Sequence, residues 1–323
     1  MKFRAAVVAA IVLSSAAAQT HVSAVAPARA DVALQYRWKQ GEALVYKTTM
    51  KTTSTMSGMP GANEVSFEQT MTQRIRLLAA AVAPDGSVTL HQTTEAVRIE
   101  MNGPAGKALF DSDDPKGAAG DEGAEALGRV FGGIVGTTIS ITMAANGAVQ
   151  RIDGIQKVID KITQDMQQDR ANPSMAQGLK SVLSVDAIRA SLEQSFPRLP
   201  PQPVKPGETW TAQIAVGSDA IGRVAGTQTF TLTSGDGPTA SIGVALVLKQ
   251  ESAPPIGPAG MTMKMGDGKG DGQIEFDVAG GRIRKSTMTT EVPSTMTTTG
   301  RDGRPATVKN VAKTSMTMEL VEK

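Results

Sequence analysis

A two-residue alternation of apolar and polar side chains runs through most of this chain and limits its fold more than any other feature. Between residues 65 and 77, apolar side chains alternate with threonine, arginine and glutamate. Successive side chains of a β-strand point to opposite faces, so this pattern is typical of strands with one face in a core and the other in water. Over residues 44–56 a similar alternation combines methionine and threonine with lysine. We therefore expect a fold made mainly of antiparallel strands.

Turn residues divide these strands into hairpins. Pro84-Asp85-Gly86 separates the strand that ends near residue 77 from another at 87–101, and the φ preferences of Pro, Asp and Gly favour a tight turn there. Within the second strand the apolar positions change parity between Leu90 and Val97. One extra residue in one strand of a pair produces such a change, so we predict a β-bulge in this interval.

Two short motifs recur in the second half of the chain. Lys39-Gln40-Gly41-Glu42 has a counterpart in Lys205-Pro206-Gly207-Glu208, and the turn at Asn146-Gly147 has one at Gly280-Gly281. We interpret this as a duplicated β unit, with chance recurrence of a common turn as the alternative.

The motifs divide the chain into four parts. Residues 1–30 precede the first unit, which covers residues 31–153 and has an insertion at about 102–134. The second unit covers residues 201–323. Between them, residues 154–200 carry apolar side chains at three- and four-residue spacing, which predicts two to three helices. The fold class is therefore α+β and β-dominated: two related antiparallel units form a curved sheet or half-barrel, or else two separate domains.

The N-terminus has the pattern of a cleavable signal peptide. Two basic residues within the first four are followed by an apolar run at 5–12, too short to span a bilayer, which takes about 20 residues. Ala28-Arg29-Ala30 fits a cleavage site, with residues 16–18 and 22–24 as competing sites and a buried N-terminal helix as the alternative. We expect a periplasmic or secreted protein.

Composition after residue 30 excludes several classes of function. The chain has no cysteine, so it forms no disulfide and lacks the lipid-carrying residue of a bacterial lipoprotein. No later segment is long and apolar enough for a transmembrane helix. Removing residues 1–30 takes three of the 33 basic side chains and none of the 31 acidic ones, which leaves a charge of −1. Near neutrality and 3% aromatic residues argue against a nucleic-acid partner, which requires a basic surface and stacking side chains.

His91 is the only histidine after residue 30. Cysteine–histidine catalysis and the usual zinc sites are therefore excluded, and a serine triad would have to use His91. His91 lies in a strand-like run, where we expect it to be exposed. Glu95 and Glu100 could act as acid and base, but their spacing does not single them out. We expect no enzyme activity and no cofactor.

Methionine is the unusual residue of this chain, with 16 copies. Met261, Met263 and Met265 lie two apart, so they share one face of a strand, and thioethers are soft ligands suited to Cu(I). The glycine-rich stretch Asp267–Gly272 has the acidic positions of an EF-hand only in part, because Lys269 stands where an oxygen ligand is needed. We expect it to be a loop before a strand at 273–278 rather than a calcium site.

Methionine also lines adaptable apolar surfaces, and this is a second interpretation of the same residues. With few aromatic rings, the alternating strands would form a thin core, which suits a curved sheet whose concave face is covered by helices. We expect the residues that face a ligand there to include Met50, Met71, Ile75, Met316 and Met318.

The Lys-x-Gly-Glu turns and paired halves resemble an uncharacterised family of exported bacterial β-rich proteins, a domain of unknown function. The expected architecture also resembles the Lol-type half-barrel carriers of lipoproteins, in which helices cover an apolar concavity. The leading hypothesis is a non-catalytic envelope protein that binds a lipid, another apolar ligand or a lipidated partner. The alternatives are a structural or protein-interaction module of the envelope, and copper handling by methionine.

Overall fold

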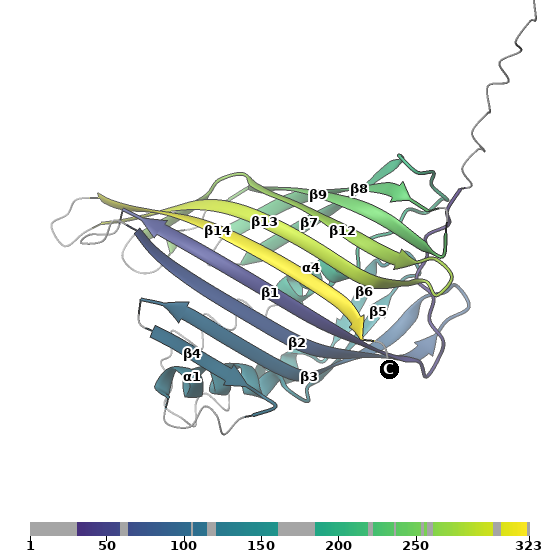
Figure 1. Cartoon of the computed structure of the whole chain (residues 1–323), viewed down its shortest axis with the longest axis horizontal. Helices are drawn as coiled ribbons and strands as arrows, with labels where there is room; N and C mark the ends of the chain where they lie inside the picture. The colour runs from purple at the N-terminus through teal and green to yellow at the C-terminus, as the bar shows by residue number, and fades with distance from the viewer. Residues whose placement is uncertain are drawn as a thin grey trace, which may run out of the picture.

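The computed structural model describes residues 31–58, 64–104, 106–114, 121–160, 185–218, 222–235, 237–252, 255–256, 261–299 and 305–321. These residues form one antiparallel sheet of 14 strands with three short helices (Figure 1). The strands are β1 Ala43–Ser57, β2 Glu64–Val82, β3 Val88–Gly103, β4 Gly106–Asp111, β5 Thr138–Met143, β6 Val149–Asp153, β7 Thr209–Ser218, β8 Gly222–Ser234, β9 Thr239–Gln250, β10 Pro255–Ile256, β11 Met261–Met265, β12 Gly268–Asp277, β13 Arg282–Thr299 and β14 Pro305–Val321. The helices are α1 Glu122–Phe131, the 3-10 helix η2 Gly132–Ile134 and α4 Val185–Ser195.

Most strands lie on one continuous path, in the order β6-β5-β3-β2-β1-β14-β13-β12-β9-β8-β7. Both halves of the chain therefore share a single sheet, and the alternative of two separate β domains is wrong. The halves meet where β1 pairs with β14, from Val45 opposite Val321 to Ser57 opposite Lys309. The expected β-dominated α+β class and the curved, open sheet are confirmed.

Each half contributes strands in the same sequential order, β1-β2-β3-β5-β6 in the first and β7-β8-β9-β12-β13 in the second. The two Lys-x-Gly-Glu turns also have the same hydrogen bonds. The Glu42 amide donates to the carbonyl of Lys39, and the Lys39 amide donates to the Glu42 carboxylate. Lys205 and Glu208 repeat both bonds.

The two ends of the strand path are joined by a helix instead of a ladder of hydrogen bonds. Helix α4 packs against both β6 and β7, which are the first and last strands of the path. The Arg189 guanidinium of α4 donates to the main-chain carbonyl of Val149 on β6, at 2.6 Å. One unpaired carbonyl of this edge is thereby satisfied, and the helix spans the gap that the curved sheet leaves open.

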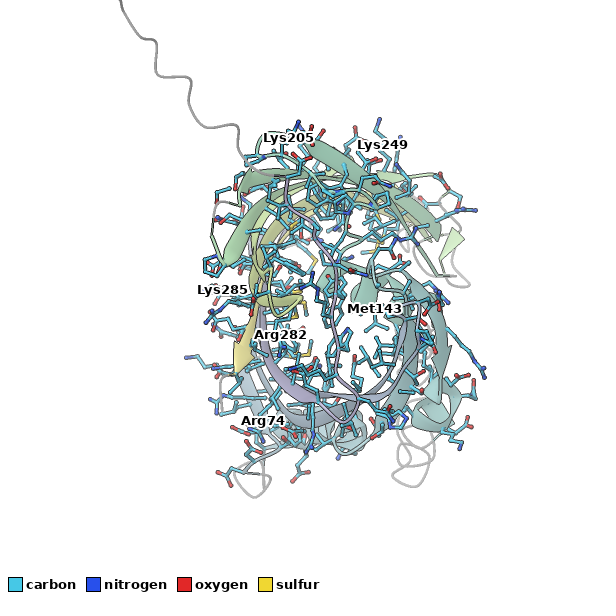
Figure 2. The ribbon with its side chains drawn as sticks, turned by 90° about the vertical axis from the view of Figure 1, so that its right-hand side faces the viewer. Arg74, Met143, Lys205, Lys249, Arg282 and Lys285 are labelled. Atoms are coloured by element: carbon cyan, nitrogen blue, oxygen red, sulfur yellow. The ribbon has the colours of Figure 1, made fainter. Side chains whose placement is uncertain are left out.

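One end of the curved sheet is filled by an aromatic cluster. Tyr36 contacts Phe196 and Phe276 edge to face, with ring centroids 6.1 Å and 5.7 Å apart, and Tyr46 contacts Phe196 at 6.0 Å. The Tyr36 hydroxyl donates to the Pro197 carbonyl. Figure 2 looks onto this end: the strands curl around it, the N-terminal segment crosses it, and Met143 and Arg282 lie inside the ring of strands.

The predicted bulge is confirmed. The pairing of β2 with β3 shifts between Arg74, opposite Ala96, and Ile75, opposite Thr94, so that Glu95 is the extra residue. Glu95 lies inside the interval where the sequence changes parity. The extra residue returns the apolar side chains to the concave face, and this explains why Leu90 and Val97 are both buried despite their odd spacing.

The insertion in the first half adds β4 to the edge of β3 and places α1 against it. Asp121 caps α1 by accepting a hydrogen bond from the amide of Ala124. The acidic residues that precede the helix form ion pairs with the sheet, Asp111 with Arg98 at 2.8 Å and Asp113 with Arg74 at 3.4 Å.

One strand starts earlier than we expected. The stretch Asp267–Gly272 does not remain a loop, because β12 begins at Gly268 and pairs with β9 from that residue onward. Gly270 and Gly272 are therefore strand residues. Two further predictions lie wholly or partly outside the described residues: the signal peptide at 1–30, and the helices between the two units, of which residues 161–184 are not described. Among the described residues, no helix has the length and hydropathy needed to cross a bilayer.

Candidate ligand-binding site

A cavity of about 430 Å³ lies on the concave face of the sheet. Strands β2, β3 and β5 form one wall, the α1–η2 segment forms another, and residues 155–159 together with α4 cover it. Ten of the described lining side chains are apolar and five are polar without charge. They are Met71, Gln73, Ile75, Gln92, Thr94, Phe131, Ile134, Thr137, Ile139, Ile155, Val158, Ile159, Ile188, Ser191 and Leu192.

Strand alternation and the bulge decide which side chains reach this cavity. On β2 the odd-numbered residues 71, 73 and 75 point inward, and on β3 the bulge at Glu95 brings Gln92 and Thr94 to the same wall. Gln73 lies 3.6 Å from the sulfur of Met71, to which its side-chain amide donates. The cavity is therefore an apolar space with a few neutral hydrogen-bonding groups.

A row of four methionines crosses the concave face beside the cavity. Met71 on β2 pairs with Met50 on β1, Met50 pairs with Met316 on β14, and Met316 pairs with Met288 on β13. Directly opposed residues on neighbouring antiparallel strands lie on the same face, with Cβ atoms about 5 Å apart. We call these four residues the methionine row. All four are half-buried.

A second, much smaller cavity of about 30 Å³ lies at the far end of the methionine row. Met316 and Met288 line it together with Phe230 on β8. Gln194 at the end of α4 and Pro197 just beyond it also line this cavity, so the segment that covers the first cavity borders the second.

Two glycines of β12 make room for the end of the row. A methyl group on Gly272 would lie 2.9 Å from the Met288 sulfur, and one on Gly270 would lie 3.0 Å from the Met288 methyl carbon. The loop predicted for Asp267–Gly272 does not account for this role of the two glycines. The available signal was their spacing of two, which keeps both on one face of a strand.

The structure brings several of the predicted ligand-facing residues together. Met71 and Ile75 line the first cavity, Met316 lines the second, and Met50 lies between them in the row. Met318 lies in the packed core, only 3% exposed. The lining residues Ile134 of η2 and Ile139 of β5 were not among the predicted ligand-facing residues, because no local pattern shows which segments border this part of the sheet.

The predicted copper ligands lie elsewhere, on the short strand β11. Met263 pairs with Met296 on β13, Met265 pairs with Ser294, and Met261 pairs with Ile256 on β10. Copper binding there stays a prediction. Among the described residues, no three His, Asp or Glu side chains come together as a metal site would require.

None of the described residues that line the two cavities is charged. Burial raises the pKa of both Tyr36 and Tyr46 above the ordinary value of a phenol. Glu42 and Arg282 form a half-buried ion pair at 2.8 Å beside them. His91 is exposed on β3, as expected, and faces away from the cavity.

The model of a protein family of unknown function, DUF6263, matches residues 85–283, which is more than half of the chain. The chain belongs to the DUF6263 family. No curated protein matches it. The match to DUF6263 covers the cavity walls from β3 to α4. All four residues of the methionine row lie outside the matched region.

Proposed function

We propose that this DUF6263 protein is an exported, non-catalytic envelope protein that binds an apolar ligand between its curved sheet and its helices. The cavity of about 430 Å³ is the observation that carries this proposal. Its volume falls within the range of roughly 300–1,000 Å³ that is usual for small-molecule sites. Its lining is mainly apolar with a few neutral polar groups, which is the usual composition of such sites.

The architecture also favours a ligand rather than a filled core. Interior side chains normally pack with few voids larger than a water molecule, and this partly open space between the sheet and the helices is far larger, so it can admit a ligand. Aromatic rings pack against one another at one end of the curved sheet, whereas a cavity remains beside Gln73, Gln92 and Thr94. The arrangement resembles the Lol-type half-barrels at the level of architecture.

Export is part of the same proposal and rests on the N-terminal sequence. Two basic residues, a short apolar run and a small-residue cleavage site give residues 1–30 the features of a signal peptide. Without a cysteine the processed protein lacks the residue that carries the lipid of a bacterial lipoprotein. A periplasmic or secreted protein with an apolar cavity would hold its ligand away from water.

Ligand binding is tested by purifying the processed protein and identifying what it retains. Native mass spectrometry of the protein and organic extraction should both reveal a bound lipid or other apolar molecule. The variant Gln92→Trp places a large ring in the cavity and should abolish this binding. His91→Trp is the matched control, since it adds the same ring one residue away on the exposed face of β3.

Retention of the same ligand by Gln92→Trp would contradict the proposed site. Absence of any ligand, together with a stoichiometric protein partner recovered from envelope extracts, would favour the alternative of a protein-interaction module. Equal loss of ligand in both tryptophan variants would indicate unfolding rather than a blocked site, and circular dichroism separates these outcomes.

A further inference from the structure

The methionine row connects the two cavities of the concave face. Its first member, Met71, lines the larger cavity, and its last two, Met316 and Met288, line the smaller one. Met50 is paired with Met71 on one side and with Met316 on the other. The two cavities therefore lie at opposite ends of one uninterrupted row of thioether side chains.

The dimensions of the row suit an extended chain. Four neighbouring strands at about 4.8 Å spacing make a row about 14 Å long. At the β2 end, this row opens into the larger cavity of about 430 Å³. The α4 segment borders both cavities, through Leu192 at the larger one and Pro197 at the smaller one, so it lies alongside the whole path.

The chemistry of methionine suits such a path as well. A methionine side chain is unbranched, has three rotatable bonds and adapts its shape to what it contacts. Leucine or isoleucine at these four positions would fix the width of the path. Gly270 and Gly272 leave the space that the Met288 side chain occupies at the far end of the row.

We propose that the ligand of this protein is a long-chain acyl group, with its end lying along the methionine row toward β13. This inference rests on the proposed function, because it specifies the occupant of the same cavity. The polar end of the ligand lies in the larger cavity, where Gln73 and Gln92 can donate to and accept from an ester, amide or acid group. The acyl chain belongs either to a free lipid or to a lipidated protein.

A chain-length series tests the path. Palmitate and octanoate, each with a fluorescent reporter, are titrated into the processed wild-type protein, Met50→Trp and Thr49→Trp. A buried methylene contributes about 0.8 kcal/mol, or about fourfold in affinity, so blocking the row should lower the palmitate-to-octanoate affinity ratio at least about tenfold. Thr49 is the neighbour on the opposite face of β1, and its variant should keep the wild-type ratio.

Photo-crosslinking tests the same path without relying on a variant that might not fold. Palmitate with a diazirine at its terminal carbon is bound to the wild-type protein, irradiated and located by peptide mass spectrometry. We expect labelling on β13 and β14, near Met288 and Met316. Labelling confined to β2 and β3 would overturn the inference, and so would an unchanged affinity ratio in folded Met50→Trp.

The failure of this inference differs from the failure of the proposed function. Wild-type protein that binds octanoate and palmitate equally well keeps its apolar site but has no acyl path along the row. Wild-type protein that binds neither probe, nor any apolar molecule, contradicts both. An N-palmitoylated peptide is tested beside free palmitate: whichever binds more tightly identifies the source of the chain, and either result supports the acyl path.

Discussion

Substitution of Gly147 by alanine should destabilise the protein by disturbing the aromatic cluster at the filled end of the sheet. Gly147 has a φ of +88°, and a methyl group there would lie 2.6 Å from the Tyr36 ring and 2.8 Å from the Pro197 carbonyl oxygen. The Pro197 oxygen also accepts a hydrogen bond from the Tyr36 hydroxyl. The ring is buried and held by this bond, so it has little freedom to move away.

Two terms contribute to the expected loss of stability. Alanine in the left-handed region costs roughly 1–2 kcal/mol. Forcing an extra methyl into a packed interior costs typically about 1–3 kcal/mol more. Gly41 provides the control, because it has a φ of +80° and open space where the methyl would be. Gly41→Ala should therefore show the backbone term alone.

Urea denaturation followed by tryptophan fluorescence or circular dichroism measures both variants. We expect the free energy of unfolding to fall by about 2–5 kcal/mol in Gly147→Ala and by roughly 1–2 kcal/mol in Gly41→Ala. The difference between them is the cost of crowding Tyr36. Equal losses in the two variants, with an unchanged m value, would refute the argument that this end is tightly packed.

Two further predictions concern single hydrogen bonds. Tyr46→Phe removes the buried hydrogen bond from the Tyr46 hydroxyl to the Ile283 carbonyl. We expect the free energy of unfolding to fall by about 1–3 kcal/mol because the carbonyl loses its partner. An unchanged free energy in a urea titration would mean that water replaces the hydroxyl. The hydrogen bond from Lys285 holds the pKa of Glu319 below its usual range. The pair therefore stabilises the fold fully at pH values above the ordinary carboxyl pKa. This stabilisation is lost as the pH falls through the lowered pKa of Glu319. A carbon-13 NMR titration should show that Lys285→Met raises the pKa of Glu319, and an unchanged pKa in that variant would contradict the assignment.

The strands and their faces could be predicted from the sequence because they depend on local alternation. Leu77 and Tyr46 are buried at positions where the parity of their strands places them inside, and the bulge at Glu95 follows from one visible change of parity. The order of strands in the sheet could not be predicted. Pairing of β1 with β14 depends on contacts between residues more than 250 positions apart, and no local pattern encodes them.

The candidate site was only partly predictable, for the same reason. Met50 and Met316 could be assigned to an apolar face, but their pairing with each other requires the register between β1 and β14. The close approach of Gly272 to Met288 depends on the register between β12 and β13. The sequence therefore predicts which side chains lie on the concave face, while the positions of these side chains relative to one another depend on long-range strand pairing.

The pairing of the first strand with the last has a consequence for the time course of folding. Met50 on β1 meets Met316 on β14, so β1 keeps one edge free until residues 305–321 have been synthesised. Contacts at such sequence separations form slowly, because a long loop must close before they stabilise anything. An unpaired strand edge can add a strand from another molecule during this interval. Folding of this sheet is therefore complete only after β14 has been synthesised, and its intermediates are exposed to aggregation until then.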